Sequence, residues 1–286
     1  MLGLRCSTSY SWPISHLAST VPHGVPGDTR VTPRSLTTST SSLPISSSAV
    51  VVGGGSLGTS TAYHLQKLGI QTTLLERSSL TAGTTWHSAG MLWNLRPSDT
   101  DVQINAYTRT LLQSLCPSAF TKNGGLIVAT TTQRFQEYQR LHETGKYFGI
   151  PSDLIDPATI NDIHPLLNTS DLVGALYSPF DGTIDPTTAT NAYAAAATSL
   201  GAHIITDTTV AHVNTTPSSN PLSPDSNTIQ SITTSCGHTI DTPVVVNACG
   251  AWAGALHAMV SLNERAAESN WLASNEIRAC CCPSAL

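Results

Sequence analysis

Three glycines and one acid give this chain its clearest chemical signal. Gly53, Gly55 and Gly58 form a G-x-G-x-x-G pattern directly after a short run of valines. Glycines at these positions permit a tight turn, let the backbone approach a pyrophosphate, and let a helix pack closely on a strand. Glu76 ends the next apolar segment, where a carboxylate can accept hydrogen bonds from a ribose diol. The spacing predicts a dinucleotide site, because a glycine turn that only packs a helix on a sheet explains the acid less well.

A strand, a helix and a second strand must hold these residues. The valine run at 50–52 predicts a buried strand. The helix that begins near Ser56 presents free N–H groups and a partial positive charge to a diphosphate. Ser56, together with Arg77 beside Glu76, completes the cofactor-binding candidates in this unit.

The loop after Glu76 distinguishes a flavin from a nicotinamide cofactor. Residues 83–90, GTTWHSAG, set small side chains where a diphosphate and a ring system would pass. His87 lies among them, and a histidine side chain can supply an imidazole nitrogen that acts as a nucleophile. Judged from the residues alone, a histidine that hydrogen-bonds the loop backbone is the simpler interpretation. The cofactor-binding candidates in this loop are Gly83, Thr84, His87, Ala89 and Gly90.

Composition excludes several functional classes. The chain has 286 residues, enough for one large or two modest domains, with a formal net charge of −5 and 11% charged residues. No basic stripe indicates nucleic-acid binding, and no apolar run is long enough to span a membrane. The seven cysteines form no C-x-x-C pair, so we expect reduced thiols rather than a disulfide framework or a metal site.

The first 48 residues differ in composition from the rest. They contain Arg5, Arg30 and Arg34 with one acid, Asp28, among many hydroxyl residues and prolines. This composition is typical of a mitochondrial transit peptide, and no continuous apolar region marks a secretory signal. We therefore expect import into the mitochondrial matrix; a disordered extension without a targeting role is the alternative.

Periodicity and turn residues predict an alternation of helices and strands. A capping-box pattern at Ser98 and Asp101 starts a helix over 99–115. A second helix, over 133–148, has an apolar face made of Phe135, Tyr138, Leu141 and Phe148. The further expected elements are short strands and turns at 151–185, strands at 126–132, 202–206, 209–213, 228–234 and 243–247, an alanine-rich helix at 187–201, a polar loop at 214–227, and a strand–glycine–helix unit at 244–256.

Several separated motifs between residues 49 and 259 resemble one family. They are GGGSLGTSTAYHL, LLERSSLTAGTTWHSAGMLWNLRPSD, NGGLIVATTTQRFQEYQRL, YSPFDGTIDP and VVNACGAWA. With these motifs in this order, the chain resembles the FAD-dependent sarcosine and dimethylglycine dehydrogenases of mitochondria, and WNLRPSD resembles the sarcosine branch more. The resemblance implies an α/β, D-amino-acid-oxidase-like fold, in which a Rossmann-type FAD-binding domain carries an inserted mixed-sheet substrate domain.

The resemblance also implies a division into domains. Residues 49–95 and 186–260 would form a discontinuous FAD-binding domain, and residues 96–185 would form part of the substrate domain. Residues 1–48 would be the transit segment. Residues 261–286 form a divergent tail that lacks family sequence, so we expect the fold to be incomplete at the C-terminus.

Some residue roles follow from the resemblance alone. In this family the histidine of the G-T-T-W-H motif carries FAD covalently through the flavin 8α-methyl group, which makes His87 the expected attachment residue. Val210 resembles the position whose backbone binds adenine. Ala248, Gly250 and Trp252 resemble a second strand-to-helix turn that approaches FAD. Simple sheet packing is an equal alternative for these last four residues.

No catalytic acid or base is identified. We expect His203, His212 and His238 at the surface, and we expect Asp181 and Asp185 to make turns or to cap a helix.

The family oxidises a secondary N-methyl amine. The resemblance implies that sarcosine passes a hydride equivalent to the flavin and yields glycine and formaldehyde, or a one-carbon unit on tetrahydrofolate. Electrons would then leave to an electron-transfer flavoprotein. Tetrahydrofolate is expected only for the full-length family, not for this chain. The alternatives are a catalytically incomplete FAD-binding fragment or a regulatory relative, and an NAD-dependent enzyme, which would leave GTTWH without a role.

Overall fold

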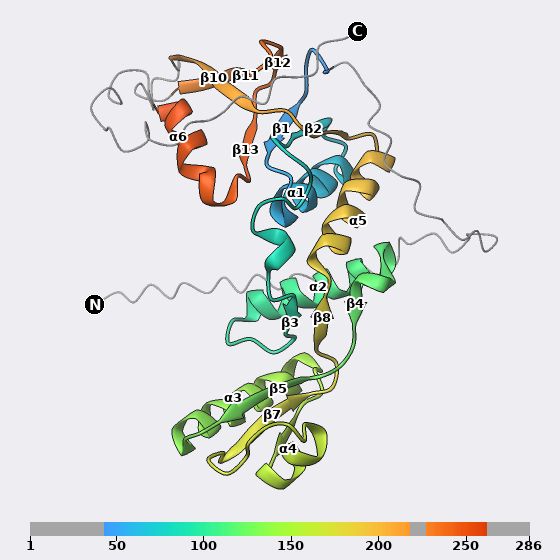
Figure 1. Ribbon diagram of the computed structural model, residues 1–286, viewed down its shortest axis with the longest axis vertical. Coiled ribbons are helices and arrows are strands. Elements are labelled where there is room, and N and C mark those ends of the chain that lie inside the picture. The colour runs from blue at the N-terminus through green and yellow to red at the C-terminus, as the bar shows by residue number, and fades with distance from the viewer. Residues whose placement is uncertain (1–42, 218–226, 262–286) are drawn as a thin grey trace, which may run out of the picture. The chain divides into compact units, whose positions relative to one another are not determined.

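The described part of the chain comprises residues 43–217 and 227–261 of a computed structural model (Figure 1). The expected transit segment up to residue 42, the centre of the expected polar loop and the tail beyond residue 261 lie outside the described residues. Of the helices in the described part, none has both the length and the apolar character needed to cross a membrane.

A four-stranded parallel sheet, in the order β13-β1-β2-β9, is the largest sheet of the described residues, and it lies in the upper part of the view in Figure 1. The valine run forms β1 (Ala49–Val52), α1 (Ser56–Lys67) follows the glycine turn, and β2 (Thr72–Leu75) pairs with β1. The predicted strand–helix–strand unit is therefore confirmed. Strand β9 (His203–Ile205) lies outside β2, and β13 (Val245–Asn247) pairs with β1 on its other side.

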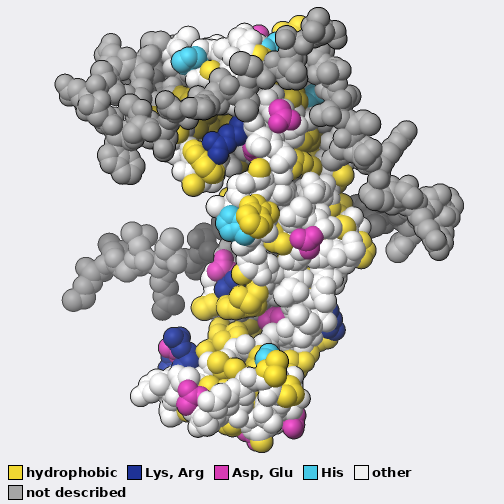
Figure 2. Space-filling model, viewed as in Figure 1, with side chains coloured by type: hydrophobic (Ala, Val, Ile, Leu, Met, Phe, Trp, Pro, Cys, Tyr) yellow, Lys and Arg dark blue, Asp and Glu magenta, His cyan; other side chains and the backbone are white. Residues whose placement is uncertain are grey.

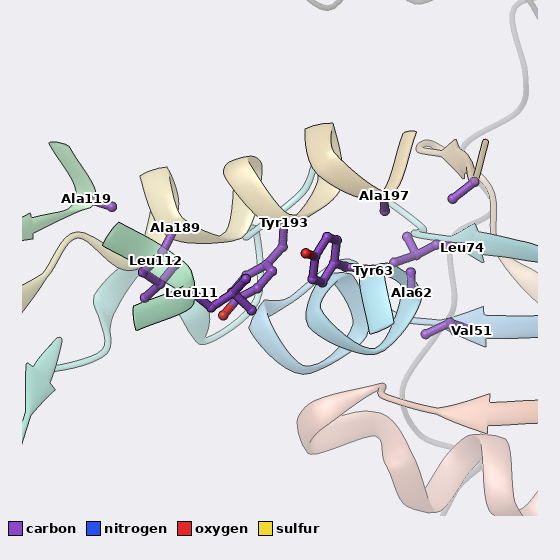
Figure 3. Packing of buried hydrophobic residues seen from close by; sticks show 11 residues of the cluster. Val51, Ala62, Tyr63, Leu74, Leu111, Leu112, Ala119, Ala189, Tyr193 and Ala197 are labelled. Carbon is purple, nitrogen blue, oxygen red and sulfur yellow. The ribbon is translucent and has the colours of Figure 1, made fainter. Parts of the chain in front are cut away.

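Both faces of this sheet are buried, which explains why β1 is a continuous apolar run rather than an alternating pattern. On one face Val51 packs with Tyr63 of α1 and Tyr193 of α5 (Pro186–Ser199). Figure 3 shows the two tyrosines between these helices, and their ring centroids are 5.9 Å apart. Val50, which points the other way, belongs to a second cluster on the opposite face.

That opposite face is covered by a three-stranded antiparallel sheet and by α6 (Ala253–Ser261). The sheet consists of β10 (Val210–Pro217), β11 (Asn227–Thr234) and β12 (Thr239–Asp241). The expected polar loop at 214–227 is wrong at its first residues, because β10 continues through them, and β12 was not expected.

The polar composition of β10 has a physical explanation. The Asn214 side-chain amide donates hydrogen bonds to Ser231 Oγ and Thr233 Oγ1, each at 2.9 Å, across the strand pair. Cross-strand polar pairs of this kind stabilise a sheet on its solvent face as apolar pairs do on its buried face. A polar run therefore resembles a loop in the sequence, although it forms a strand here.

The segment between β2 and α5 forms two further three-stranded sheets and three helices. The first sheet has the order β3 (Met91–Leu92), β8 (Gly182–Ile184) and β4 (Phe120–Thr121). The second sheet has the order β5 (Gly125–Ala129), β7 (Gly174–Ser178) and β6 (Asp153–Ile155). The helices of this segment are α2 (Asp99–Leu115), α3 (Thr132–Phe148) and α4 (Pro157–Ile163). It also contains the 3₁₀ turns η2 (Thr85–His87) and η3 (Pro117–Ala119), and a further 3₁₀ turn, η4 (Gly250–Trp252), follows β13.

Helix starts agree with the capping residues. The Ser98 hydroxyl accepts from the Asp101 N–H at the start of α2, which confirms the predicted helix. Helix α4 was not expected, because its prolines indicated turns. Asp156 caps this helix and Pro157 is its first residue, a position where the missing N–H of proline costs nothing.

The apolar face of α3 is confirmed in part. Tyr138 is buried, and Phe135 and Leu141 pack against the same cluster as Leu176 of β7. Phe148, the last residue of the helix, lies outside this cluster and contacts the ring of Tyr147 edge-on. The apolar face therefore ends before the helix does.

Removal of the α5 cap is expected to cost about 1 kcal/mol of unfolding free energy. Asp185 accepts from the backbone N–H groups of Thr187 and Thr188, and Asp185→Ala leaves both donors without this partner. The Thr188 side chain, first among the causes, lowers the pKa of the Asp185 carboxyl. This contribution to stability is therefore present above the ordinary carboxyl pKa of 3.8 and is lost as pH falls through the lower folded-state pKa.

Denaturant titration of Asp185→Ala and of its matched control Asp185→Asn measures this effect. The asparagine variant keeps a capping oxygen and should retain most of the stability at neutral pH. Equal losses in both variants would contradict the capping role.

Candidate cofactor site

Two strand-to-helix turns meet at the carboxyl end of the parallel sheet. The chain leaves β1 toward β2 on one side, while β13 lies on the other side, so the order of connections reverses between β1 and β13. Ligands of open α/β sheets bind at such a switch point. The Ala248 N–H donates to Val52 O at 2.9 Å, and a Cβ on Gly53, whose φ is +117°, would overlap the Ala248 carbonyl oxygen. Only glycine therefore allows these two turns to lie this close.

The N-terminus of α1 is open to an anion. Its N-cap residue, Gly55, provides no side-chain hydrogen bond, and the first turn contains no acidic residue. A Cβ on Gly58 would overlap the carbonyl oxygen of Gly53, so the glycine turn packs directly beneath the helix. The helix N-terminus thus keeps its partial positive charge without an internal counter-charge, as a diphosphate requires.

Thr85 is a site residue that the sequence did not single out. Its Oγ1 accepts from the Ser56 N–H at 3.2 Å and would lie 3.0 Å from a Cβ on Gly55. The second threonine of GTTWH thereby joins the loop to the start of α1. The signal was present in the motif, but only the folded chain shows which of the two threonines reaches the helix.

Glu76 is held in position by the backbone on both sides. Its Oε2 accepts from the Gly54 N–H at 2.6 Å, and its Oε1 accepts from the Ser78 N–H at 2.9 Å. Each carboxylate oxygen has a further lone pair for a ribose hydroxyl. The carboxylate therefore stabilises the glycine turn and still fits the predicted contact with a diol.

Predicted residues from the loop after β2 and from the turn after β13 come together at Trp252. The Arg77 guanidinium carbon lies 3.9 Å from the centroid of the Trp252 ring, and a Cβ on Gly83 would be 3.9 Å from that ring. Gly250 belongs to the same 3₁₀ turn as Trp252. The structure thus brings together residues from two segments that lie far apart in the sequence.

Cys249 lies in the same crevice and was not expected there. Its thiol donates to Val52 O, with Sγ 3.4 Å away. Burial, and after it the Glu76 charge, raise the pKa of the Cys249 thiol to about 11, although the Arg77 charge opposes this rise. The thiol is therefore neutral at physiological pH and is not a nucleophile.

Val210 lies at the start of β10, close to the acid. Its side chain is buried in the cluster that contains Val52, and the Thr208 N–H donates to the Glu76 carbonyl at 2.9 Å. The strand thus enters the fold beside the segment that would hold the ribose. The side chain of Val210 serves packing, and any cofactor contact would be made by its backbone.

His87 ends the 3₁₀ turn that follows Thr84, and its side chain is exposed. Its ring contacts the Trp86 ring at 4.7 Å between centroids, and among the described residues it makes no hydrogen bond. The structure therefore does not show the loop-backbone hydrogen bond required by the simpler interpretation of this histidine.

A cavity of about 480 Å³ adjoins the start of α1. Its walls come from the loop after His87, from α2, from β8 and from α5. The lining residues are Ser56, Ser88, Ala89, Gly90, Met91, Trp93, Arg96, Thr108, Leu112, Ile184, Pro186, Ala189, Thr190 and Tyr193. Ser56, Ala89 and Gly90, predicted as cofactor-binding residues, are among them.

The remaining polar candidates have structural partners or face solvent. Asp181 is buried and accepts from the backbone and side chain of Asn94 at 2.8 and 2.6 Å. His238 donates from Nε2 to Pro44 O at 3.0 Å and is partly buried, whereas His203 and His212 are exposed. Within 43–217 and 227–261 no group of three or more histidines, cysteines and acids gathers as metal ligands would.

The parallel sheet, the open helix terminus and the anchored acid define a dinucleotide-binding α/β protein, and these residues fit FAD. The family described as "DAO: FAD dependent oxidoreductase" matches residues 48–269. The chain belongs to this family of FAD-dependent oxidoreductases, and the predicted fold class is confirmed.

Two of the similar proteins are mitochondrial dehydrogenases. The chain is 40% identical over 227 residues to human mitochondrial sarcosine dehydrogenase, a match that covers 77% of this chain and 24% of the relative. It is 38% identical over 160 residues to human mitochondrial dimethylglycine dehydrogenase, with 54% and 18% covered. The chain therefore spans about a quarter, or less, of the length of these relatives.

The chain is also similar to a protein with a different name and to a solved structure. The mouse mitochondrial pyruvate dehydrogenase phosphatase regulatory subunit is 37% identical over 177 residues, which is 60% of this chain and 20% of that protein. The crystal structure of L-proline dehydrogenase from P. horikoshii matches with a TM-score of 0.68 at 29% identity, covering 77% of this chain and 57% of that one.

Gly58→Ala is expected to destabilise the chain by about 1–3 kcal/mol and to abolish flavin binding. The reason is the overlap of the added methyl group with the Gly53 carbonyl oxygen, which must move and open the glycine turn. Thermal unfolding and the flavin content of the purified chain measure both effects.

Gly254→Ala on α6 is the matched control, because nothing lies within 4 Å of its added Cβ. It should retain wild-type stability and flavin content. A Gly58→Ala protein indistinguishable from this control would refute the close approach of helix and turn.

Proposed function

We propose that this chain provides the cofactor-binding part of an FAD-dependent dehydrogenase that oxidises the N-methyl amine of sarcosine. One observation carries the proposal: the Thr85 hydroxyl of GTTWH is bonded to the N-terminus of α1, while His87 in the same turn is exposed and makes no hydrogen bond among the described residues. The 40% identity to human sarcosine dehydrogenase supports the same substrate class.

The residues that would hold FAD come from several segments of the chain. The glycine turn and Ser56 would bind the diphosphate, and Glu76 would accept from the ribose. The loop at 83–90 would pass along the cofactor, with His87 as the covalent attachment residue. The remaining contacts would come from Arg77, Val210, Ala248, Gly250 and Trp252.

When bound, FAD would accept a hydride equivalent from the N-methyl group of the substrate. The residues of the chain would bind the cofactor and orient it. Helix α1 would supply positive partial charge to the diphosphate, and the backbone N–H groups of Gly54 and Ser78 hold the carboxylate of Glu76. The neutral Cys249 thiol would add no negative charge to a crevice that must accept a dianion.

The wider biochemical context is also a proposal, supported by the mitochondrial relatives. The products would be glycine and formaldehyde, or a folate-bound one-carbon unit in the full-length proteins. Electrons would pass to an electron-transfer flavoprotein in the mitochondrial matrix. The FAD-binding domain would comprise residues 49–95 and 186–260, and residues 96–185 would form part of the substrate domain.

His87→Ala is expected to eliminate covalently bound flavin. The wild-type chain, unfolded in acid and separated from small molecules, should retain flavin absorbance on the polypeptide, whereas the variant should release all of it. His203→Ala, at another exposed histidine, is the control and should retain covalent flavin. Release of free flavin from the denatured wild type would rule out attachment.

A second candidate is a non-catalytic regulatory relative. The observation in its favour is the 37% identity to the mouse pyruvate dehydrogenase phosphatase regulatory subunit. Such a protein would bind FAD through the same turn without oxidising an amine.

Dye reduction separates the two candidates. We expect sarcosine, added to the flavin-loaded chain, to reduce an artificial electron acceptor, with dimethylglycine as the comparison substrate. Stable flavin incorporation without any amine-dependent reduction would favour the regulatory candidate and reject the dehydrogenase.

A further inference from the structure

The cavity beside the start of α1 has the composition of a small-molecule site. Most of its walls are apolar, from Met91 on β3 to Leu112 on α2 and Ile184 on β8. Its volume of about 480 Å³ lies within the range of ligand pockets, which combine apolar walls with a few polar groups. Among its lining residues, the polar groups in the interior include one cation and one buried hydroxyl.

The cation is Arg96. Its guanidinium carbon lies 4.8 Å from the centroid of the Trp93 ring, and both residues line the cavity. The two ion pairs of the described residues join Arg134 to Glu137 and Lys146 to Glu143, so Arg96 has no carboxylate partner there. A guanidinium that is stacked on an aromatic ring loses little freedom when it binds a carboxylate with two parallel hydrogen bonds.

The buried hydroxyl belongs to Thr190 on α5. This residue is 1% exposed, and its Oγ1 has no hydrogen-bond partner in the described structure. On the same helix Thr198 donates to the Ala194 carbonyl at 2.9 Å, which is the usual arrangement for a helical threonine. A buried hydroxyl without a partner is costly and calls for an explanation, and a ligand in the cavity supplies one.

The other groups that face the cavity do not compete for an anion. Burial raises the pKa of the Tyr193 phenol to about 12, so this residue is neutral at physiological pH. No aspartate or glutamate lines the cavity. Arg96 therefore faces the cavity with an uncompensated positive charge.

We propose that this cavity binds the carboxylate of a small amino-acid substrate, with Arg96 paired to the carboxylate and the Thr190 hydroxyl bonded to one of its oxygens. The apolar walls would contact the aliphatic part of the molecule. The identity of this ligand as the substrate rests on the function proposed above. The cofactor diphosphate is the other source of an anion near Ser56, and the experiment distinguishes the two.

The test uses the full chain and two probes in ligand-detected NMR titrations. Methoxyacetate has a carboxylate on an ether of substrate size, and 2-methoxyethanol is its uncharged counterpart. Arg96→Gln should weaken methoxyacetate binding roughly 10- to 100-fold, as expected for a lost hydrogen bond to a charged group, and leave 2-methoxyethanol unchanged. Arg96→Lys should retain part of the affinity.

A titration with ADP tests the alternative that the cavity binds the cofactor diphosphate. If Arg96→Gln weakens binding of ADP and leaves methoxyacetate binding unchanged, the cavity belongs to the diphosphate and the proposal is overturned. Failure of the wild-type chain to bind methoxyacetate also overturns it.

A matched pair of threonine variants keeps the proposal testable if the Arg96 variants do not fold. Thr73 on β2 is 0% exposed and also has an unpartnered Oγ1, but it does not line the cavity. Thr73→Val and Thr190→Val each remove a buried unsatisfied hydroxyl, so both should raise the thermal midpoint. Only Thr190→Val should weaken methoxyacetate binding, roughly 2- to 10-fold; equal affinities in both variants would remove Thr190 from the site.

Failure of this inference is distinguishable from failure of the proposed function. A chain that retains flavin and oxidises sarcosine, but whose KM does not change in Arg96→Gln, contradicts the inference alone. A chain that holds no flavin but binds methoxyacetate through Arg96 contradicts the proposed function alone.

Discussion

The structure depends on the backbone contact between the end of β1 and the turn after β13. The hydrogen bond from the Ala248 N–H to Val52 O continues the parallel pairing beyond the strands, and Gly53 gives it room because it lacks a Cβ. This contact places two strand-to-helix turns side by side at the edge of the sheet where the connections reverse. The crevice, and with it any dinucleotide site, exists because these two segments meet.

The cofactor loop is positioned by polar contacts rather than by burial. The loop at 83–90 is mostly exposed, so the hydrophobic effect does little to order it. The Thr85 hydroxyl, bonded to Ser56 N–H, joins this loop to the rigid start of α1, and the Glu76 carboxylate joins the glycine turn to the segment after β2. These few hydrogen bonds therefore align the residues that the buried core cannot reach.

The packed side of α1 and α5 explains how the cavity arises beside the site. Tyr63 and Tyr193 fill the space between these helices near the sheet, and smaller residues such as Ala189 follow toward the start of α5 (Figure 3). Apolar side chains are visible on the described surface around the middle of the view in Figure 2. Helix α5 thus packs into the hydrophobic core along most of its length, and its first turns line the cavity.

Local signals were sufficient where a single segment decides its own conformation. The valine run followed by G-x-G-x-x-G predicted β1, the turn and α1, and the caps at Ser98 and Asp185 agree with the starts of α2 and α5. The same reasoning failed at α4, where prolines were interpreted as turns, and at β10, where a polar run was interpreted as a loop. In both cases the sequence signal allowed two conformations, and long-range packing or strand pairing selected one.

By itself, the sequence determined the βαβ unit, the acid at its end and the motifs of the family, because these depend on residues close together in the chain. Only the tertiary structure decided that Trp252 stacks on Arg77, that Thr85 is the threonine bonded to α1, and that Arg96 and Thr190 line one cavity. Contacts between segments far apart in the chain depend on how sheets and helices pack. A linear pattern carries no distance between such segments, so it could name most of the participants but not their partners.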